Sequence, residues 1–158
     1  MKLRLILGDQ LTPAVSSLSN VTKGDLILMC EVRQEATYAK HHKKKIAFIF
    51  SAMRHFAQGL AAQGLNVRYV AYDDAHNTGS LLGEVKKAID LHDFDELIVT
   101  KPGEYRLLSE FEAWADQLLV PVTLREDDRF LCTTEDFAHW ANGRKQMRME
   151  YFLSLIHI

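Results

Sequence analysis

Five short apolar runs, separated by polar or amphipathic segments, constrain the fold of this chain more than any other feature. Each run is long enough for a buried strand and far too short to span a membrane. We expect strands at residues 3–7, 26–32, 66–72, 96–100 and 120–125. The connecting segments have 15 or more residues, which is the length that right-handed crossovers between parallel strands require.

Helices are expected in these connections and after the last strand. The predicted helices cover residues 13–18, 42–63, 80–91, 106–119 and about 133–141. The second has the clearest pattern, because apolar residues from Ile46 to Ala61 recur at three- and four-residue spacing and Gly64 suits its C-cap. The alternation predicts an α/β fold, a Rossmann-like doubly wound five-stranded parallel sheet of order 3-2-1-4-5 with helices on both faces.

A sheet of this order binds ligands beyond the carboxyl ends of its strands, next to the point where strand order reverses. That point lies between the first and fourth strands, so residues 8–10 are expected to face residues 100–104 across a crevice. The end of the second strand lies beside it. The candidate binding residues from these two strand ends are Gly8, Asp9, Gln10, Glu31, Val32 and Glu35.

The chemistry of this crevice differs from that of a phosphate site. No G-x-G-x-x-G follows the first strand, and no G-x-x-x-x-G-K-[ST] occurs in the sequence, so the backbone geometry that cradles phosphates is not encoded. Short polar side chains and carboxylates are instead suited to hydrogen-bonding a neutral heterocycle or a polyol. No catalytic acid, base or nucleophile is assigned.

Several of these residues also have a purely structural interpretation. Asp9 is equally well suited to cap the turn that follows it, and Glu31 can form an ion pair with a lysine or arginine. Lys101 and Glu104 flank a Pro-Gly turn, where charges are most often solvated. These alternatives remain open at the level of sequence.

No metal site is expected. His41 and His42 are adjacent and therefore point in different directions on a helix, and nothing in the sequence fixes their position relative to the acidic loop at residues 73–76. Cys30 and Cys132 show neither a disulfide framework nor metal-ligand spacing, so both are expected to be reduced structural thiols.

Composition indicates a single globular unit without a global basic field. The chain has 158 residues, is 47% hydrophobic and carries a net charge of −2, so any contact with nucleic acid would rest on local patches. The apolar run at the N-terminus ends at Gly8, too early for a signal peptide. We expect a cytoplasmic protein with no membrane partner.

The pattern changes at residue 126. Residues 144–152 are rich in methionine and aromatic residues but complete no sixth strand-helix unit, which favours packing against a partner surface. We therefore divide the chain into a domain at 1–125 and a segment at 126–158 that begins a further, missing domain. Its last residues, 153–158, are expected to be a non-native tail.

Five strings in this order carry a family resemblance. They are LRLILGDQL (3–11), CEVRQEATYAKHHKKKIAFIFSAMRHFA (30–57), TKPGEYR (100–106), DDRFL (127–131) and GRKQMRMEYF (143–152). They resemble the bacterial photolyase-related proteins of the photolyase/cryptochrome superfamily, that is, iron-sulfur bacterial cryptochromes and (6-4) photolyases. The likeness covers about residues 3–152.

The resemblance implies an amino-terminal antenna domain that holds 6,7-dimethyl-8-ribityllumazine. FAD and an iron-sulfur cluster would lie in a helical domain that this chain lacks, so the chain alone is expected to be inactive, although its parent would be a DNA photolyase or cryptochrome acting on damaged DNA or in signalling. The positions that match the lumazine site are Gly8, Asp9, Gln10, Cys30, Glu31, Val32, Glu35 and Ile49.

Two further expectations follow for this site and its class. Glu35 is predicted to accept a hydrogen bond from the ring or the ribityl chain, with the Lys43–Lys45 cluster compensating its charge. The competing functional classes are a stand-alone nucleotide-binding module of the universal-stress-protein type and a pure interaction domain. The first of these usually needs the glycine-rich phosphate loop that is absent here.

Overall fold

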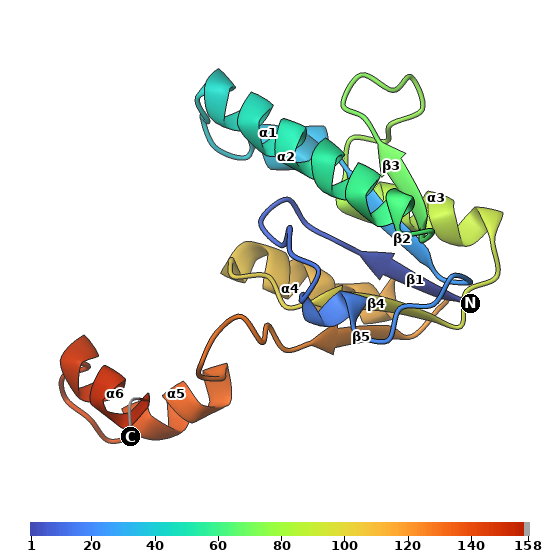
Figure 1. Cartoon of the computed structure of the whole chain (residues 1–158). Helices are drawn as coiled ribbons and strands as arrows, with labels where there is room; N and C mark the ends of the chain where they lie inside the picture. Colours follow the sequence, from blue (N-terminus) through green and yellow to red (C-terminus); the bar gives the residue numbers. More distant parts are fainter. Residues whose placement is uncertain (157–158) are drawn as a thin grey trace.

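The structure is a computed structural model that describes residues 1–156. Five parallel strands form one sheet in the order β3-β2-β1-β4-β5, which confirms the predicted fold class and strand order (Figure 1). The strands are β1 (Lys2–Leu5), β2 (Leu26–Cys30), β3 (Asn66–Val70), β4 (Glu96–Thr100) and β5 (Val122–Arg125).

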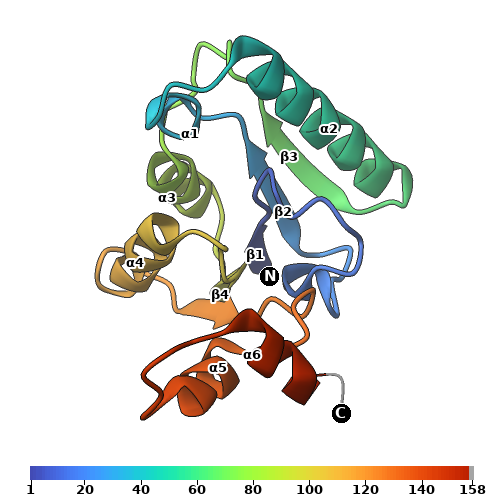
Figure 2. The same ribbon diagram turned by 90° about the vertical axis from the view of Figure 1, so that its left-hand side faces the viewer.

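Helices cover both faces of the sheet (Figure 2). The long helix α2 (Lys43–Ala62) lies on one face, and α3 (Leu81–Leu91) and α4 (Tyr105–Ala113) lie on the other. A hydrophobic core lies on each face of the sheet, and alternate residues of β2 belong to different cores. Ile27 and Met29 pack toward α2, whereas Leu28 and Cys30 belong to the core under α3 and α4. The strand is buried on both sides, as its continuous apolar sequence requires.

The ends of α2 follow from local chemistry. His42 is the N-cap, and its Nδ1 accepts a hydrogen bond from the backbone N–H of Lys44 at 3.1 Å. At the other end Gly64 adopts a φ of 82°, a left-handed conformation that glycine takes at little cost. The predicted bounds of this helix agree with the structure to within a residue at each end.

The prediction of a helix at residues 13–18 was wrong. Only a short 3-10 turn, η1 (Ser16–Leu18), forms there. Arginines from the sheet take the carbonyls of this segment: Arg4 donates to Ser17 and Ser19 oxygens at 2.6 and 3.0 Å, and Arg125 donates to the Ser16 oxygen at 2.7 Å. The Ser16 oxygen also accepts from the Ser19 N–H at 3.1 Å, which closes the 3-10 turn.

Two further helical segments differ from expectation. A short helix, α1 (Arg33–Thr37), precedes α2 and was not predicted. The helix expected at 106–119 is α4 followed by a 3-10 turn, η2 (Trp114–Asp116), in which Trp114 is fully buried. Trp114 packs on Phe111 with ring centroids 4.3 Å apart. The change from α-helix to 3-10 turn thus coincides with the burial of the Trp114 side chain.

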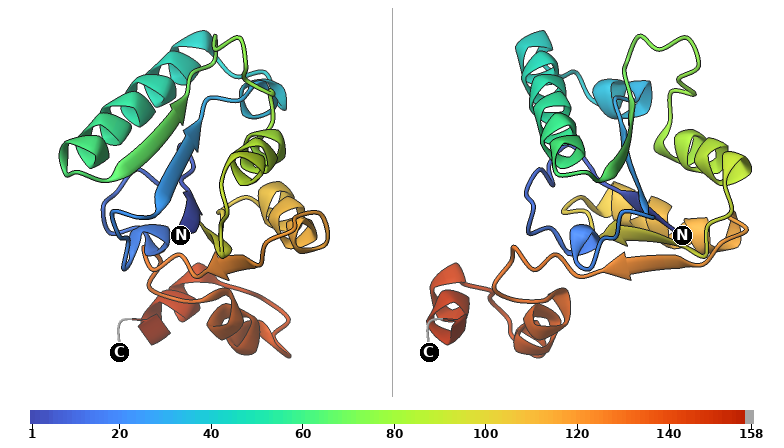
Figure 3. Two further views of the ribbon diagram at one scale, coloured as in Figure 1. Left: turned by 90° about the vertical axis from the view of Figure 1, so that its right-hand side faces the viewer. Right: turned by 45° about the vertical axis from the view of Figure 1, so that its right-hand side comes forward.

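The segment after β5 forms two helices that lie beyond the sheet (Figure 3). These helices are α5 (Thr134–Ala141) and α6 (Met149–Ile156), of which only α5 was predicted. They pack on each other through Phe137, Trp140 and Phe152, with the Trp140 and Phe152 rings 4.9 Å apart. Of the expected tail at 153–158, residues 157 and 158 lie outside the described part of the chain.

No helix in the described range 1–156 combines the length and the hydropathy that a bilayer crossing needs.

Candidate functional site

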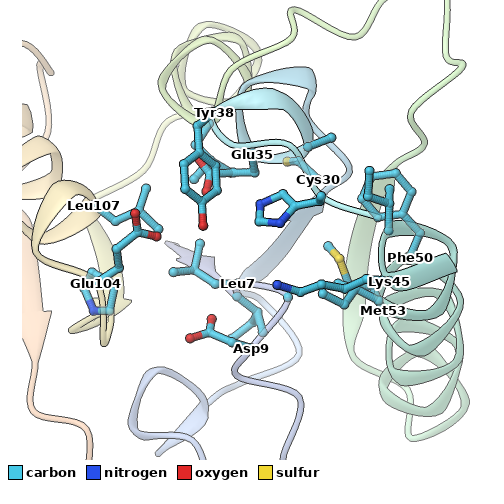
Figure 4. A pocket seen from close by; sticks show the side chains of 18 residues that line it. Leu7, Asp9, Cys30, Glu35, Tyr38, Lys45, Phe50, Met53, Glu104 and Leu107 are labelled. Atoms are coloured by element: carbon cyan, nitrogen blue, oxygen red, sulfur yellow. The ribbon is translucent and has the colours of Figure 1, made fainter. Parts of the chain in front are cut away.

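A cavity of about 230 Å³ lies beyond the carboxyl ends of β1 and β2 (Figure 4). One wall comes from α2, a second from α1 and the residues after it, and a third from α4 and the turn that precedes it. The lining side chains are mostly apolar: Ile6, Leu7, Ile46, Ile49, Phe50, Met53, Leu81, Pro102 and Leu107. The cavity opens where strand order reverses, the place that the predicted topology indicates.

Five of the eight candidate binding residues line this cavity. They are Gly8, Asp9, Cys30, Glu35 and Ile49. Pro102 and Glu104 lie on the same cavity, so the expected juxtaposition of residues 8–10 with residues 100–104 is present. Glu104, for which the sequence allows both a solvated loop charge and a site role, has a side chain that is 41% exposed and also contributes to the cavity wall.

Gly8 allows α2 to approach the end of β1. A Cβ built on Gly8 would lie 3.1 Å from both Ile49 Cγ2 and Met53 Sδ, so the apolar wall of the cavity rests directly on this glycine. The exposed side chain of Asp9 makes no hydrogen bond with any described residue, while its backbone oxygen accepts from Arg129 Nη1 at 2.6 Å. The capping alternative for Asp9 is therefore absent from this structure.

Gln10 and Val32 do not line the cavity. Gln10 is fully buried, accepts from the backbone N–H of Leu7 at 3.3 Å and donates from Nε2 to the Thr100 oxygen at 3.1 Å, so it fastens the turn after β1 to β4. Val32 is buried in the core under α3 and α4. Both side chains are buried in the protein interior next to the site, and neither lines the cavity.

Glu31 also points away from the cavity, and its ion-pair interpretation is confirmed. Its carboxylate is fully buried and accepts from Arg54 Nε and Nη2 at 2.6 and 2.8 Å, from Tyr69 Oη at 2.5 Å and from the Tyr72 N–H at 2.8 Å. Burial alone would raise the pKa of Glu31, but these hydrogen bonds outweigh it and hold the pKa below its ordinary value. Glu31 thus joins β2, β3 and α2.

Glu35 lies on the cavity wall, but its charge partner differs from the expected one. Arg106 donates from Nη1 and Nη2 to the two carboxylate oxygens of Glu35 at 3.0 and 2.8 Å. The ion pairs of the described residues do not include Lys43–Lys45. Lys43 and Lys44 are exposed, and Lys45 lines the far side of the cavity (Figure 4).

Sequence reasoning missed several residues of the site. Tyr38 and His41 line the cavity from the segment between α1 and α2, and Leu107 lines it from α4. Arg106 anchors Glu35 from 71 residues away in the chain. A tyrosine, a histidine and a leucine at these positions carry no periodic signal of their own, since only the folded topology brings α4 against α1.

The arrangement is suited to holding a flat ring and poorly suited to acid-base chemistry. Most of the lining side chains are apolar, and a few carboxylates and cations stand among them. Burial raises the pKa of the Cys30 thiol strongly, with a further contribution from the Glu84 charge, so Cys30 is an apolar contact surface and no nucleophile. Among residues 1–156, no group of three or more His, Cys, Asp or Glu side chains could hold a metal ion.

Comparisons with known proteins identify the family. A family model described as deoxyribodipyrimidine photo-lyase-related protein matches residues 4–154. A protein of Agrobacterium fabrum (strain C58 / ATCC 33970) named (6-4) photolyase is 53% identical over 152 residues, which are 96% of this chain and 30% of that protein. The chain therefore spans less than a third of this relative's length. With almost its whole length matched, the chain belongs to the deoxyribodipyrimidine photo-lyase-related protein family.

Proposed function

We propose that this chain is the amino-terminal light-harvesting domain of a flavin-dependent photolyase or cryptochrome, and that it binds 6,7-dimethyl-8-ribityllumazine. The observation that carries this proposal is the apolar cavity at the strand ends, formed by α2, α1 and α4 in a photolyase-related chain. An antenna requires a site that excludes water and fixes a ring, and mostly apolar walls on three sides favour both.

The residues present fit such a chromophore. At about 230 Å³ the cavity is below the roughly 300–1,000 Å³ that encloses a whole drug-sized ligand, so it suits a fused two-ring heterocycle whose polyol tail extends to the mouth. Ile49, Phe50 and Met53 offer apolar contact to a ring, and Asp9, Glu35 and Glu104 offer acceptors for N–H and hydroxyl groups. When bound, the lumazine would absorb near-UV or blue light and pass the excitation to a flavin.

The same residues do not fit FAD or an iron-sulfur cluster. A four-cysteine cluster needs more ligands than the two cysteines of this chain, and no dinucleotide fingerprint follows β1. We assign both groups to a further helical domain of the parent protein, which would contact damaged DNA in the cytoplasm. The lumazine site would then act through excitation transfer alone, with no catalytic residue in this chain.

Titration with lumazine, FAD and ATP, followed by fluorescence and by melting temperature, tests the assignment. We expect the chain to bind lumazine and neither nucleotide, whereas ATP binding without lumazine binding would favour the universal-stress-protein class.

A cavity-filling variant tests the position of the site. Ala36→Phe places a phenyl ring in the cavity and should abolish lumazine binding, because Ala36 lines the cavity wall. Ala47→Phe is the matched control on the exposed face of α2 and should leave binding unchanged. Equal binding by both variants would place the ligand elsewhere.

A further inference from the structure

The helix α1 forms a wall of the proposed ligand cavity but has little apolar packing of its own. None of its five residues is buried. Its connections to the rest of the domain include the Gln34 N–H, which donates to the Gly79 oxygen at 2.9 Å, and Gln34 Nε2, which donates to Glu110 at 3.0 Å. A wall without buried side chains depends on such polar contacts for its position.

Arg106 of α4 makes the most extensive of these contacts. Besides holding both oxygens of Glu35, its guanidinium donates from Nε to Glu104 Oε1 at 2.8 Å. Its carbon Cζ also lies 4.2 Å from the centre of the Tyr38 ring, within cation-π range. One side chain therefore uses its edges for two carboxylates and its face for an aromatic ring.

The three groups that Arg106 contacts all line the cavity. Glu35 and Tyr38 come from the α1 side, and Glu104 comes from the turn before α4. Figure 4 shows Glu35 and Tyr38 on one side of the cavity and Glu104 with Leu107 on another. Arg106 itself lies outside the lining set, so it reaches a ligand only through these three groups.

Removing Arg106 would leave both oxygens of Glu35 without their guanidinium partner and would also remove the contact between the same group and Glu104. Burial raises the pKa of Glu110 and the Glu35 charge raises it further, whereas the Arg106 charge lowers it, so the loss of Arg106 would leave the repulsion between Glu35 and Glu110 less compensated. A lysine cannot replace the guanidinium, since an ammonium group lacks the planar fork and the stacking face.

We propose that Arg106 is a positioning residue that fixes the α1 wall of the cavity and thereby controls how long a ligand stays bound. The ligand part of this inference rests on the proposed function, whereas the effect on α1 does not. Arg106 is about one-third exposed, so its replacement leaves the two cores of the sheet intact. Its loss should act on the site and hardly on the fold.

The test compares Arg106→Gln with the parent chain in two measurements. Stopped-flow fluorescence with 6,7-dimethyl-8-ribityllumazine should show a dissociation rate raised roughly tenfold, the size expected for losing a partly buried charge-assisted contact. Hydrogen exchange should become faster at residues 33–41 and stay unchanged at residues 26–30. Arg106→Lys should restore part of both effects, because one ion pair returns without the fork and the stacking.

Arg33→Gln is the control, because Arg33 is exposed on the same helix and appears in no ion pair of the described residues. It should change neither measurement. Unchanged exchange at residues 33–41 in Arg106→Gln, an equal change in Arg33→Gln, or full recovery in Arg106→Lys would each overturn the inference. If the parent chain binds no lumazine, the proposed function fails, and the exchange measurement still decides the role of Arg106.

Discussion

Glu31 and Glu35 are four positions apart in the sequence and have different surroundings. Glu31 faces Arg54 of α2 and Tyr69 of β3 and has no exposed surface. Glu35 faces Arg106 of α4 and is about one-quarter exposed on the cavity wall. The first carboxylate is a structural junction, and the second is available to a ligand. Replacements at the two positions should therefore separate stability from binding.

Glu31→Ala should lower the free energy of unfolding by about 2 to 3 kcal/mol, because it leaves the Tyr69 hydroxyl and the Tyr72 N–H without their buried acceptor. Urea denaturation measures this change. Glu112→Ala, at an exposed position of α4, should stay within about 0.5 kcal/mol of the parent. A loss no larger than that of the control would mean that solvent replaces these hydrogen bonds at little cost.

The contribution of Glu31 should depend on pH in one direction. Its folded-state pKa lies below the ordinary value of 4.5, so the unfolded chain takes up the proton first as pH falls. The stabilisation is therefore complete above the ordinary pKa and is lost as pH drops through the lowered one. The difference in unfolding free energy between the parent and Glu31→Gln, measured from pH 7 to pH 3, should shrink below about pH 4.5. A difference that grows in acid would contradict the depressed pKa.

Glu35→Ala should weaken lumazine binding by about 1 to 3 kcal/mol, since a charge-assisted acceptor on the cavity wall is lost. The unfolding free energy should change by no more than about 1 kcal/mol, because the ion pair with Arg106 is partly solvated. Isothermal titration and thermal melting measure the two effects, again with Glu112→Ala as control. Unchanged affinity together with a clearly lower melting temperature would make Glu35 a structural residue only.

At the scale of elements, the site depends on how closely helices approach the strand ends. Gly8 lets α2 lie against the turn after β1. Gly83 lies in the first turn of α3, where its N–H donates to the Ser80 side chain at 3.1 Å. A Cβ at this glycine would lie 2.5 Å from Thr78 Oγ1 and 2.8 Å from Ser80 Oγ. The cap of α3 and the loop before it thus leave no space for a methyl group.

Gly83→Ala should therefore destabilise the protein by about 1 to 2 kcal/mol through displacement of the Ser80 cap, although alanine is the better helix former. Gly59→Ala on α2 is the matched control: apart from its two chain neighbours and the nearby backbone of its own helix, no atom lies within 4 Å of the added Cβ, so it should stabilise by up to about 1 kcal/mol. Chemical denaturation measures the change in unfolding free energy, which should be negative for Gly83→Ala and positive for Gly59→Ala. A stabilised Gly83→Ala would show that the loop at residue 78 moves freely.

At the scale of the whole molecule, the sheet domain and the α5–α6 segment have different packing. Both faces of the sheet are covered by buried cores. In α5 only Trp140 is buried, while Phe130, Leu131 and Met149 are more than half exposed. An open groove of about 940 Å³ separates this segment from residues 101–108. Apolar exposure on this scale is typical of a surface that packs against another domain.

Residues 126–154 should therefore exchange amide hydrogens faster than β2, with an opening free energy lower by at least about 2 kcal/mol. Hydrogen exchange with mass spectrometry on a dilute monomeric sample measures the difference, and peptides from α3 serve as the internal reference for the sheet domain. Protection of residues 134–141 equal to that of residues 26–30 would show that α5 and α6 are stable without further partners.

The sequence alone predicted the five-stranded sheet and its long helix α2, but neither α1 nor α6. Apolar runs and helical periodicity predicted the five strands and the bounds of α2, because these patterns report local burial along one chain segment. The predicted strand order is the usual one for a doubly wound sheet, and the structure confirms it. The predicted topology located the crevice at the strand ends. The five sequence strings between residues 3 and 152 indicated the family to which the chain belongs. The helix expected at 13–18 does not form, and tertiary hydrogen bonds from Arg4 and Arg125 hold the segment by its carbonyls, contacts that no local pattern encodes.

Only the tertiary structure decided which side chains meet at the site. Strand alternation places Glu31 on the α2 side with Ile27 and Met29, but only the tertiary structure shows that Arg54 and Tyr69 meet its carboxylate there and that Arg106 meets Glu35 on the cavity wall. Lys43–Lys45 are near Glu35 in sequence, yet Arg106 pairs with it because α4 packs beside α1. Such pairs join segments far apart in the chain, and their geometry depends on where the sheet places each helix, so local periodicity carries no information about them.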